Sequence, residues 1–126
     1  MKINWQNASN QEQKLFEGIS ILTDHRRDLL EFLFDPKTPR LRKRAGIIRE
    51  DSWLFSDGDR LIIQAALDFW SGAGHLALWE CIEIWDNEEW THFLAAVTVI
   101  KVIDLQKIRL KTERIDPGVK DNNRLP

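Results

Sequence analysis

The sequence predicts an all-α, or mostly α, protein: a compact bundle of four to five helices around a central apolar helix at about residues 59–71. Three observations lead to this fold class. The chain of 126 residues is 43% apolar and 30% charged, as is typical of a globular protein. Its apolar residues recur mainly at helical spacing. Residues 61–70 are polar at only two positions. We expect one helical domain over residues 1–116 and a mobile C-terminal tail over residues 117–126, after the Asp-Pro-Gly stretch that ends it.

The first helical region, residues 10–34, is expected to begin with a capping box. Ser9 and Glu12 have the spacing at which each side chain accepts a hydrogen bond from the backbone N–H of the other. The apolar residues that follow at helical spacing are Leu15, Ile19, Leu22, Leu29 and Leu33. Thr23 and Asp24 could cap a restart, so one long helix and two shorter ones both fit.

A second helix is predicted from Thr38, with Pro39 in its first turn, where the fixed φ of proline is suitable. The charge here is uneven: residues 36–49 hold six basic and no acidic residues, whereas residues 50–104 hold 11 acidic and two basic ones. The six cations are Lys37, Arg40, Arg42, Lys43, Arg44 and Arg49. Binding of nucleic acid or another polyanion through this basic helix, 37–49, is therefore one alternative function. The other interpretation is a solvated surface that pairs with the protein's own acidic residues.

The central helix is predicted to begin at Ser56, a good N-cap, and to end at Gly72. Between them Gln64 and Asp68 belong to one thin polar stripe, and the remaining positions are almost all apolar. A helix with so little polar surface should be covered on most sides, so we place it at the centre of the core.

Residues 79–90 read WECIEIWDNEEW and combine three tryptophans, the only cysteine and five carboxylates. Their second half is interpreted as the start of a helix. Asp86 would be the N-cap, Glu89 would complete a capping box, and Trp85 and Trp90 would form the hydrophobic staple across it. One structural assignment thus accounts for four residues that otherwise suggest a catalytic or metal site.

Residues 76–85 are expected to form a short helix whose buried side includes Leu78 and Ile82. A short strand over 76–85 is the alternative, although it would place a glutamate on the more apolar face. The last helix should run from Asn87 to at least Asp104, and the β-branched residues of 97–102 also fit a strand.

The pattern contains no complete catalytic set, and we predict no metal and no cofactor. Glu89 and His92 have the one-turn spacing of di-iron helix bundles, but the sequence holds no second copy of that motif. His25 lies on the apolar stripe of the first helical region and is expected to be packed. Cys81 lies between glutamates, which raise a thiol pKa and so oppose reactivity. An enzyme that uses His75 with Glu80 in a shared pocket is a second alternative function.

Tryptophan is the remaining anomaly, with six residues and no tyrosine. Exposed tryptophan is favoured at interface hot spots. The candidate partner interface consists of Trp53, Trp70, Trp79 and Trp85. We therefore predict a small non-catalytic binding protein that acts through a protein partner or as a homo-oligomer. A polar N-terminal segment, a single cysteine and the lack of a long apolar run predict a cytoplasmic location without membrane insertion.

Overall fold

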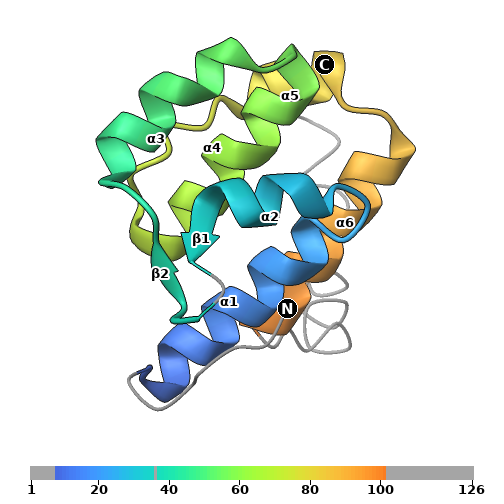
Figure 1. The fold of residues 1–126 in the computed structure, drawn as a ribbon. Coiled ribbons are helices and arrows are strands. Elements are labelled where there is room, and N and C mark those ends of the chain that lie inside the picture. Colours follow the sequence, from blue (N-terminus) through green and yellow to red (C-terminus); the bar gives the residue numbers. More distant parts are fainter. Residues whose placement is uncertain (1–7, 36, 102–126) are drawn as a thin grey trace, which may run out of the picture.

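The computed structural model describes residues 8–35 and 37–101 (Figure 1). This part of the chain contains six α-helices, one 3-10 helix and one two-stranded sheet, which confirms the mostly α fold class. The predicted tail, 117–126, lies outside the described residues. The elements are α1 (Asn10–Leu22), α2 (Arg27–Leu33), β1 (Phe34–Asp35), β2 (Arg40–Leu41), α3 (Ala45–Asp51), η2 (Ser52–Leu54), α4 (Asp57–Ser71), α5 (Leu78–Ile84) and α6 (Asn87–Ile100).

The first helical region is two helices, α1 and α2. The capping box at the start of α1 is confirmed, because the Glu12 N–H donates to Ser9 Oγ at 3.1 Å and the Ser9 N–H donates to the Glu12 carboxylate at 3.0 Å. Thr23 ends α1: its hydroxyl donates to the carbonyl of Ile19 at 2.9 Å. The helix restarts at Arg27 without a side-chain cap, so Thr23 terminates one helix and does not begin the next.

The predicted helix over residues 38–49 is wrong in its first half. β1 and β2 form an antiparallel hairpin in which Phe34 pairs with Leu41, and α3 begins only at Ala45. Phe34 is fully buried, and its ring packs edge-on against Phe16 and Trp70, each at 5.0 Å between ring centroids. Extending the chain here lets Phe34 reach the core, and that burial outweighs the local preference for a helix at residues 38–44.

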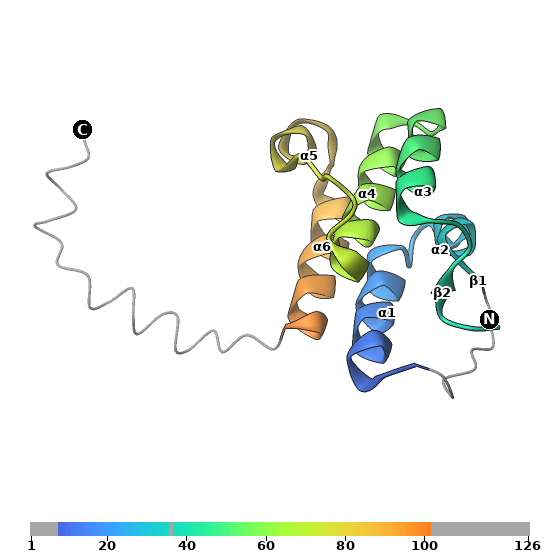
Figure 2. The ribbon, with the colours of Figure 1, turned by 90° about the vertical axis from the view of Figure 1, so that its left-hand side faces the viewer.

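The central helix is confirmed as α4, which passes between the other helices (Figures 1 and 2). Ser56 is its N-cap, and Gly72 ends it with a φ of 74°, a left-handed conformation that glycine adopts without strain. All residues of 61–67 are buried. The first part of the polar stripe is covered as well, since Arg60 is 2% exposed and Gln64 4% exposed, whereas Asp68 is half-buried.

The short helix α5 confirms a helix at residues 78–84, so the strand alternative over 76–85 is wrong. The helix start at Asp86 is also confirmed: Asp86 accepts from the N–H of Glu88 and Glu89, and Glu89 accepts from the N–H of Asp86. The staple exists too, with Trp85 and Trp90 packed edge-on at 5.3 Å. α6 ends at Ile100 with Lys101 as an extended C-cap, so the prediction that this helix continues to at least Asp104 is wrong. Residues 97–100 are helical, so the strand alternative is also wrong over these residues.

Packing of α4 against its neighbours fixes one end of the bundle. The indole N–H of Trp85, just after α5, donates to the carbonyl of Gly58 in the first turn of α4 at 3.2 Å. η2 lies immediately before α4 in the chain. Both α5 and η2 therefore sit at the end of the bundle where α4 begins (Figures 1 and 2).

Candidate interaction surface

The four candidate tryptophans divide into two exposed and two packed residues. Trp53 and Trp79 are each 64% exposed. Trp85 is buried in the staple, and Trp70 is partly buried against Phe34. Only Trp53 and Trp79 are thus available to a partner in the way an interface hot spot requires.

Three further large apolar side chains are more than half exposed at the same end of the bundle. Leu54 is 85% exposed, Leu78 53% and Ile82 70%. Together with Trp53 and Trp79 they form what we call the η2–α5 surface. The prediction that Leu78 and Ile82 lie on the buried side of their helix is wrong.

The rotation of α5 explains this exposure. α5 turns Cys81, which is fully buried, toward the core. Glu80 lies on a neighbouring part of the helix and is held by Arg60 of α4 at 3.1 Å. Five of the seven residues of α5 are apolar, and a helix of about two turns cannot bury all of them on one side. That excess was a signal in the sequence that some of them would be left exposed.

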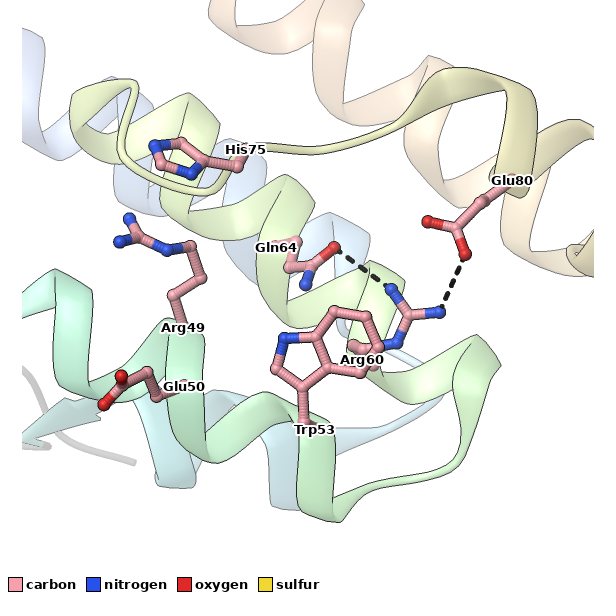
Figure 3. Close-up of a pocket in the computed structure, with 7 residues that line it drawn as sticks. All are labelled: Arg49, Glu50, Trp53, Arg60, Gln64, His75 and Glu80. Atoms are coloured by element: carbon pink, nitrogen blue, oxygen red, sulfur yellow. Dashed lines mark hydrogen bonds and ion pairs between the residues drawn. The ribbon is translucent and has the colours of Figure 1, made fainter.

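Arg60 is the polar centre of this end (Figure 3). Its guanidinium donates to Glu80 at 3.1 Å and to Gln64 at 3.4 Å, and Trp53 covers it with 4.2 Å between the guanidinium carbon and the ring centroid. A buried cation is tolerated when it is paired and hydrogen-bonded in this way. The Arg60–Glu80 pair therefore fixes how α5 and Trp53 lie on α4.

A cavity of about 190 Å³ lies beside Arg60. Its lining residues are Arg49, Glu50, Trp53, Arg60, Gln64, His75 and Glu80. His75 and Glu80 thus line one cavity, as the enzyme hypothesis requires, but they lie at opposite ends of it (Figure 3). The Glu80 carboxylate is already paired with Arg60, and none of the seven described lining residues is a serine or a cysteine. The cavity therefore offers no nucleophile for an acyl-transfer reaction.

The loop between α4 and α5 is held by one side chain. The Asp68 carboxylate accepts from three consecutive backbone N–H groups, those of Gly74 at 2.7 Å, His75 at 3.1 Å and Leu76 at 3.0 Å. His75 has a φ of 56°, in the left-handed region that few non-glycine residues adopt. Asp68 thus stabilises a constrained loop that leads directly into α5.

The basic residues are mostly directed to solvent, and they do not share one helical face. They are distributed over the hairpin turn, β2, the following bend and α3. Lys43 pairs with Asp51 at 3.1 Å, and the guanidinium groups of Arg42 and Arg49 donate to backbone carbonyls. Three cations remain, and these are Lys37, Arg40 and Arg44. None of them makes an ion pair within the described part of the chain. Of the six basic residues, only Lys43 therefore forms an ion pair with the acidic residues of 50–104 in the described part of the chain.

Cys81 is buried among apolar side chains, as its neighbours in the sequence indicated. Burial, and after it the charge of Glu80, raises the pKa of the Cys81 thiol to about 11. At neutral pH the thiol is therefore protonated and a poor nucleophile.

Comparison with protein-family models, curated proteins and solved structures found no match. Among the described helices, none has the length and hydropathy needed to cross a bilayer.

Proposed function

We propose that this protein is a non-catalytic interaction protein that self-associates, and that its η2–α5 surface docks on the basic segment of a second copy. The observation that carries the proposal is the exposure of five large apolar side chains, each more than half exposed, at one end of the bundle. Clustered exposed apolar residues typically mark interaction sites, and tryptophan is the residue most enriched in hot spots.

The charges around the surface favour a basic occupant. Glu50 and Glu83 are exposed on α3 and α5, and Asp57 is 70% exposed at the start of α4. The chain itself carries a matching basic segment, residues 37–44, in which Lys37, Arg40 and Arg44 have no ion-pair partner among the described residues. Ile47, 46% exposed on α3, adds an apolar contact beside that segment. Complementary charge of this kind steers association and fixes its register.

Contact between two different surfaces has a geometric consequence. Each copy would present the η2–α5 surface to one neighbour and the basic segment to another, so the association is head-to-tail. Such contacts build rings or open chains, and they need not stop at a dimer. Because the contact includes paired charges, it should weaken as salt rises.

The test is the mass of the protein by light scattering after size exclusion, at low and at moderate salt. We expect a mass above that of the monomer at low salt, a smaller mass at moderate salt, and a monomer for Ile82→Glu. The matched control is Leu94→Glu on α6, because Leu94 is 56% exposed and lies outside the η2–α5 surface. Both substitutions are at exposed positions and should change stability by only about 0.5 kcal/mol. A wild-type monomer at every concentration, or an Ile82→Glu variant with the wild-type mass, would refute the proposal.

Polyanion binding by the basic segment is the second candidate, because Lys37, Arg40 and Arg44 are exposed and have no ion-pair partner in the described part of the chain. The direct test is binding of a fluorescent DNA duplex by the wild type and by an Arg40→Ser/Arg44→Ser variant. A phosphate-driven mode predicts affinity that falls steeply with salt and falls further in the variant. Salt-independent binding would exclude it.

A cytoplasmic location is part of the proposal. It is supported by the single cysteine, which cannot form an intrachain disulfide and lies buried as a thiol. Microscopy of the tagged full-length chain would test it. Accumulation in an oxidising compartment would contradict it.

A further inference from the structure

Three potential metal ligands meet where the junction of α1 and α2 contacts the start of α6. They are His25, Glu88 and Glu89, and each offers one ligand atom such that all three atoms lie within 4.8 Å of one another. Two of the atoms are closer: His25 Nε2 and Glu89 Oε2 are 3.8 Å apart. The fold thus brings together one nitrogen and two oxygen ligands from segments far apart in the sequence.

The His25 imidazole is the unusual member of this group. Both of its ring nitrogens are buried, and neither has a hydrogen-bond partner among the described residues; the side chain as a whole is 12% exposed. Buried polar atoms nearly always have a partner, and a bound metal ion is one species that would supply it. The distance to Glu89 is too long for a hydrogen bond. It is close to the separation of roughly 3.4 Å expected for two ligands on one tetrahedral ion with bonds of about 2.1 Å.

The surroundings hold these ligands in place and leave their donor atoms available. Glu89 uses Oε1 to accept the Asp86 N–H at 2.9 Å, which orients the side chain and leaves Oε2 toward His25. His92 stacks on His25 with 4.2 Å between ring centroids, and His92 Nδ1 lies 2.8 Å from the carbonyl of Glu88. His25 is therefore fixed on one face by a second ring.

The local charge also favours a cation. Three carboxylates lie within four positions at the start of α6, at Asp86, Glu88 and Glu89. The nearest cation in sequence, Arg26, is already paired with Asp28 and Asp59. The dipole of α6 stabilises these carboxylates and opposes a cation, but its partial charge is smaller than the charge of three carboxylates.

We propose that His25, Glu88 and Glu89 bind one divalent transition-metal ion of the zinc class. Calcium and magnesium prefer oxygen ligands alone, whereas imidazole with carboxylates suits zinc and its neighbours. Three protein ligands leave a fourth position for water. The ion would tie the junction of α1 and α2 to α6. The proposed site differs from the sequence-based expectation of no metal. In the sequence Glu89 has ligand spacing only with His92, whereas the fold places His25 against Glu89.

The experiment uses the full chain after removal of metal with a chelator. Titration with Zn²⁺ by calorimetry should show saturable binding of one ion per chain, and the melting temperature should rise with Zn²⁺ because the ion binds the folded state. Co²⁺ should give the visible absorption bands of a four-coordinate ion and should quench the fluorescence of the neighbouring Trp90. The absence of saturable one-to-one binding by the wild type would overturn the proposal.

Variants locate the site. Glu88→Gln removes a ligand whose carboxylate has no part in the capping box, and His25→Asn removes the imidazole; each should weaken Zn²⁺ binding by about tenfold or more. The matched control is Glu83→Gln, an exposed glutamate on α5 outside the cluster, which should bind as the wild type does. Wild-type affinity for Zn²⁺ in Glu88→Gln would overturn the assignment of the ligands. This test is valid even if His25→Asn fails to fold. Loss of binding in His92→Asn with retention in His25→Asn would also overturn it, since the ion would then belong to Glu89 and His92.

Discussion

Replacement of Asp68 by alanine should destabilise the protein more than any other single change to an exposed or half-buried acid. Asp68 accepts three backbone N–H bonds, at 2.7, 3.1 and 3.0 Å, from the loop that leads into α5. Hydrogen bonds to a charged group each contribute about 1.5–3 kcal/mol, and water can replace part of this at a half-buried site. We therefore expect Asp68→Ala to lose about 3 kcal/mol of unfolding free energy.

The loss is measurable by urea denaturation and by thermal melting, both followed by circular dichroism. For a domain of this size, about 3 kcal/mol corresponds to a fall in melting temperature of roughly 11 °C. Asp68→Asn should lose less, because its amide oxygen still accepts while its NH₂ group faces the N–H donors. The control is Asp24→Ala: Asp24 is 71% exposed and pairs with Arg27 at 3.7 Å, which is worth about 0.5 kcal/mol or less. A loss from Asp68→Ala as small as that from the control would refute the role of Asp68 as the anchor of the loop.

Substitutions at glycines that flank or begin α4, and at Glu89 in the first turn of α6, give two further predictions. Gly74→Ala should cost about 3 kcal/mol or more in urea denaturation, because its Cβ would overlap the carbonyl of Gln64 in α4. Gly58→Ala, with nothing within 4 Å of the added Cβ, should be neutral or stabilising. In metal-free protein, Glu89→Gln should be at least as stable as the wild type at neutral pH and equal to it in acid. Glutamine retains the capping box, and burial followed by the nearby Asp86 raises the pKa of Glu89 above 4.5.

The sign of the Glu89 prediction follows from linkage. A carboxyl whose pKa is raised on folding stabilises the protein fully below its unfolded value of 4.5, and this contribution is lost as the pH rises through the folded pKa. The contribution of Asp86 to stability has the opposite pH dependence, because the Glu89 carboxyl and the N–H groups of Glu88 and Glu89 lower the pKa of Asp86 below 3.8. Its contribution is present above that value and is lost in acid. Urea denaturation of the wild type and of Glu89→Gln at several pH values checks both contributions. The raised pKa of Glu89 would be contradicted if the variant lost stability relative to the wild type on going from acidic to neutral pH.

The helix ends were predictable because each depends on a few neighbouring residues. The capping boxes at Ser9 and Asp86, the N-cap at Ser56 and the glycine stop at Gly72 all involve backbone groups within four positions. The staple of tryptophans beside Asp86 belongs to the same group. Interactions of this range are set by the local sequence and need no knowledge of the rest of the fold.

The sequence failed where a distant contact competed with a local preference. Pro39 suits the first turn of a helix, yet the chain is extended there because Phe34 is buried against two other aromatic rings. Leu78 and Ile82 have the spacing of a buried stripe, yet they are exposed because the fold turns Cys81 to the core and binds Glu80 to Arg60. In both cases the deciding partner lies many residues away.

By itself, then, the sequence determined the helical class, most helix boundaries and the uneven charge, all of which follow from hydrophobic periodicity and from hydrogen bonds within a turn. Only the tertiary structure decided which apolar side chains remain in water and which histidine meets the acids at the start of α6. The reason is physical: a helix can bury only one side, and which side it buries depends on the surface it packs against. His25 is placed against Glu89 by the packing of α1 on α6, a contact that no local pattern specifies.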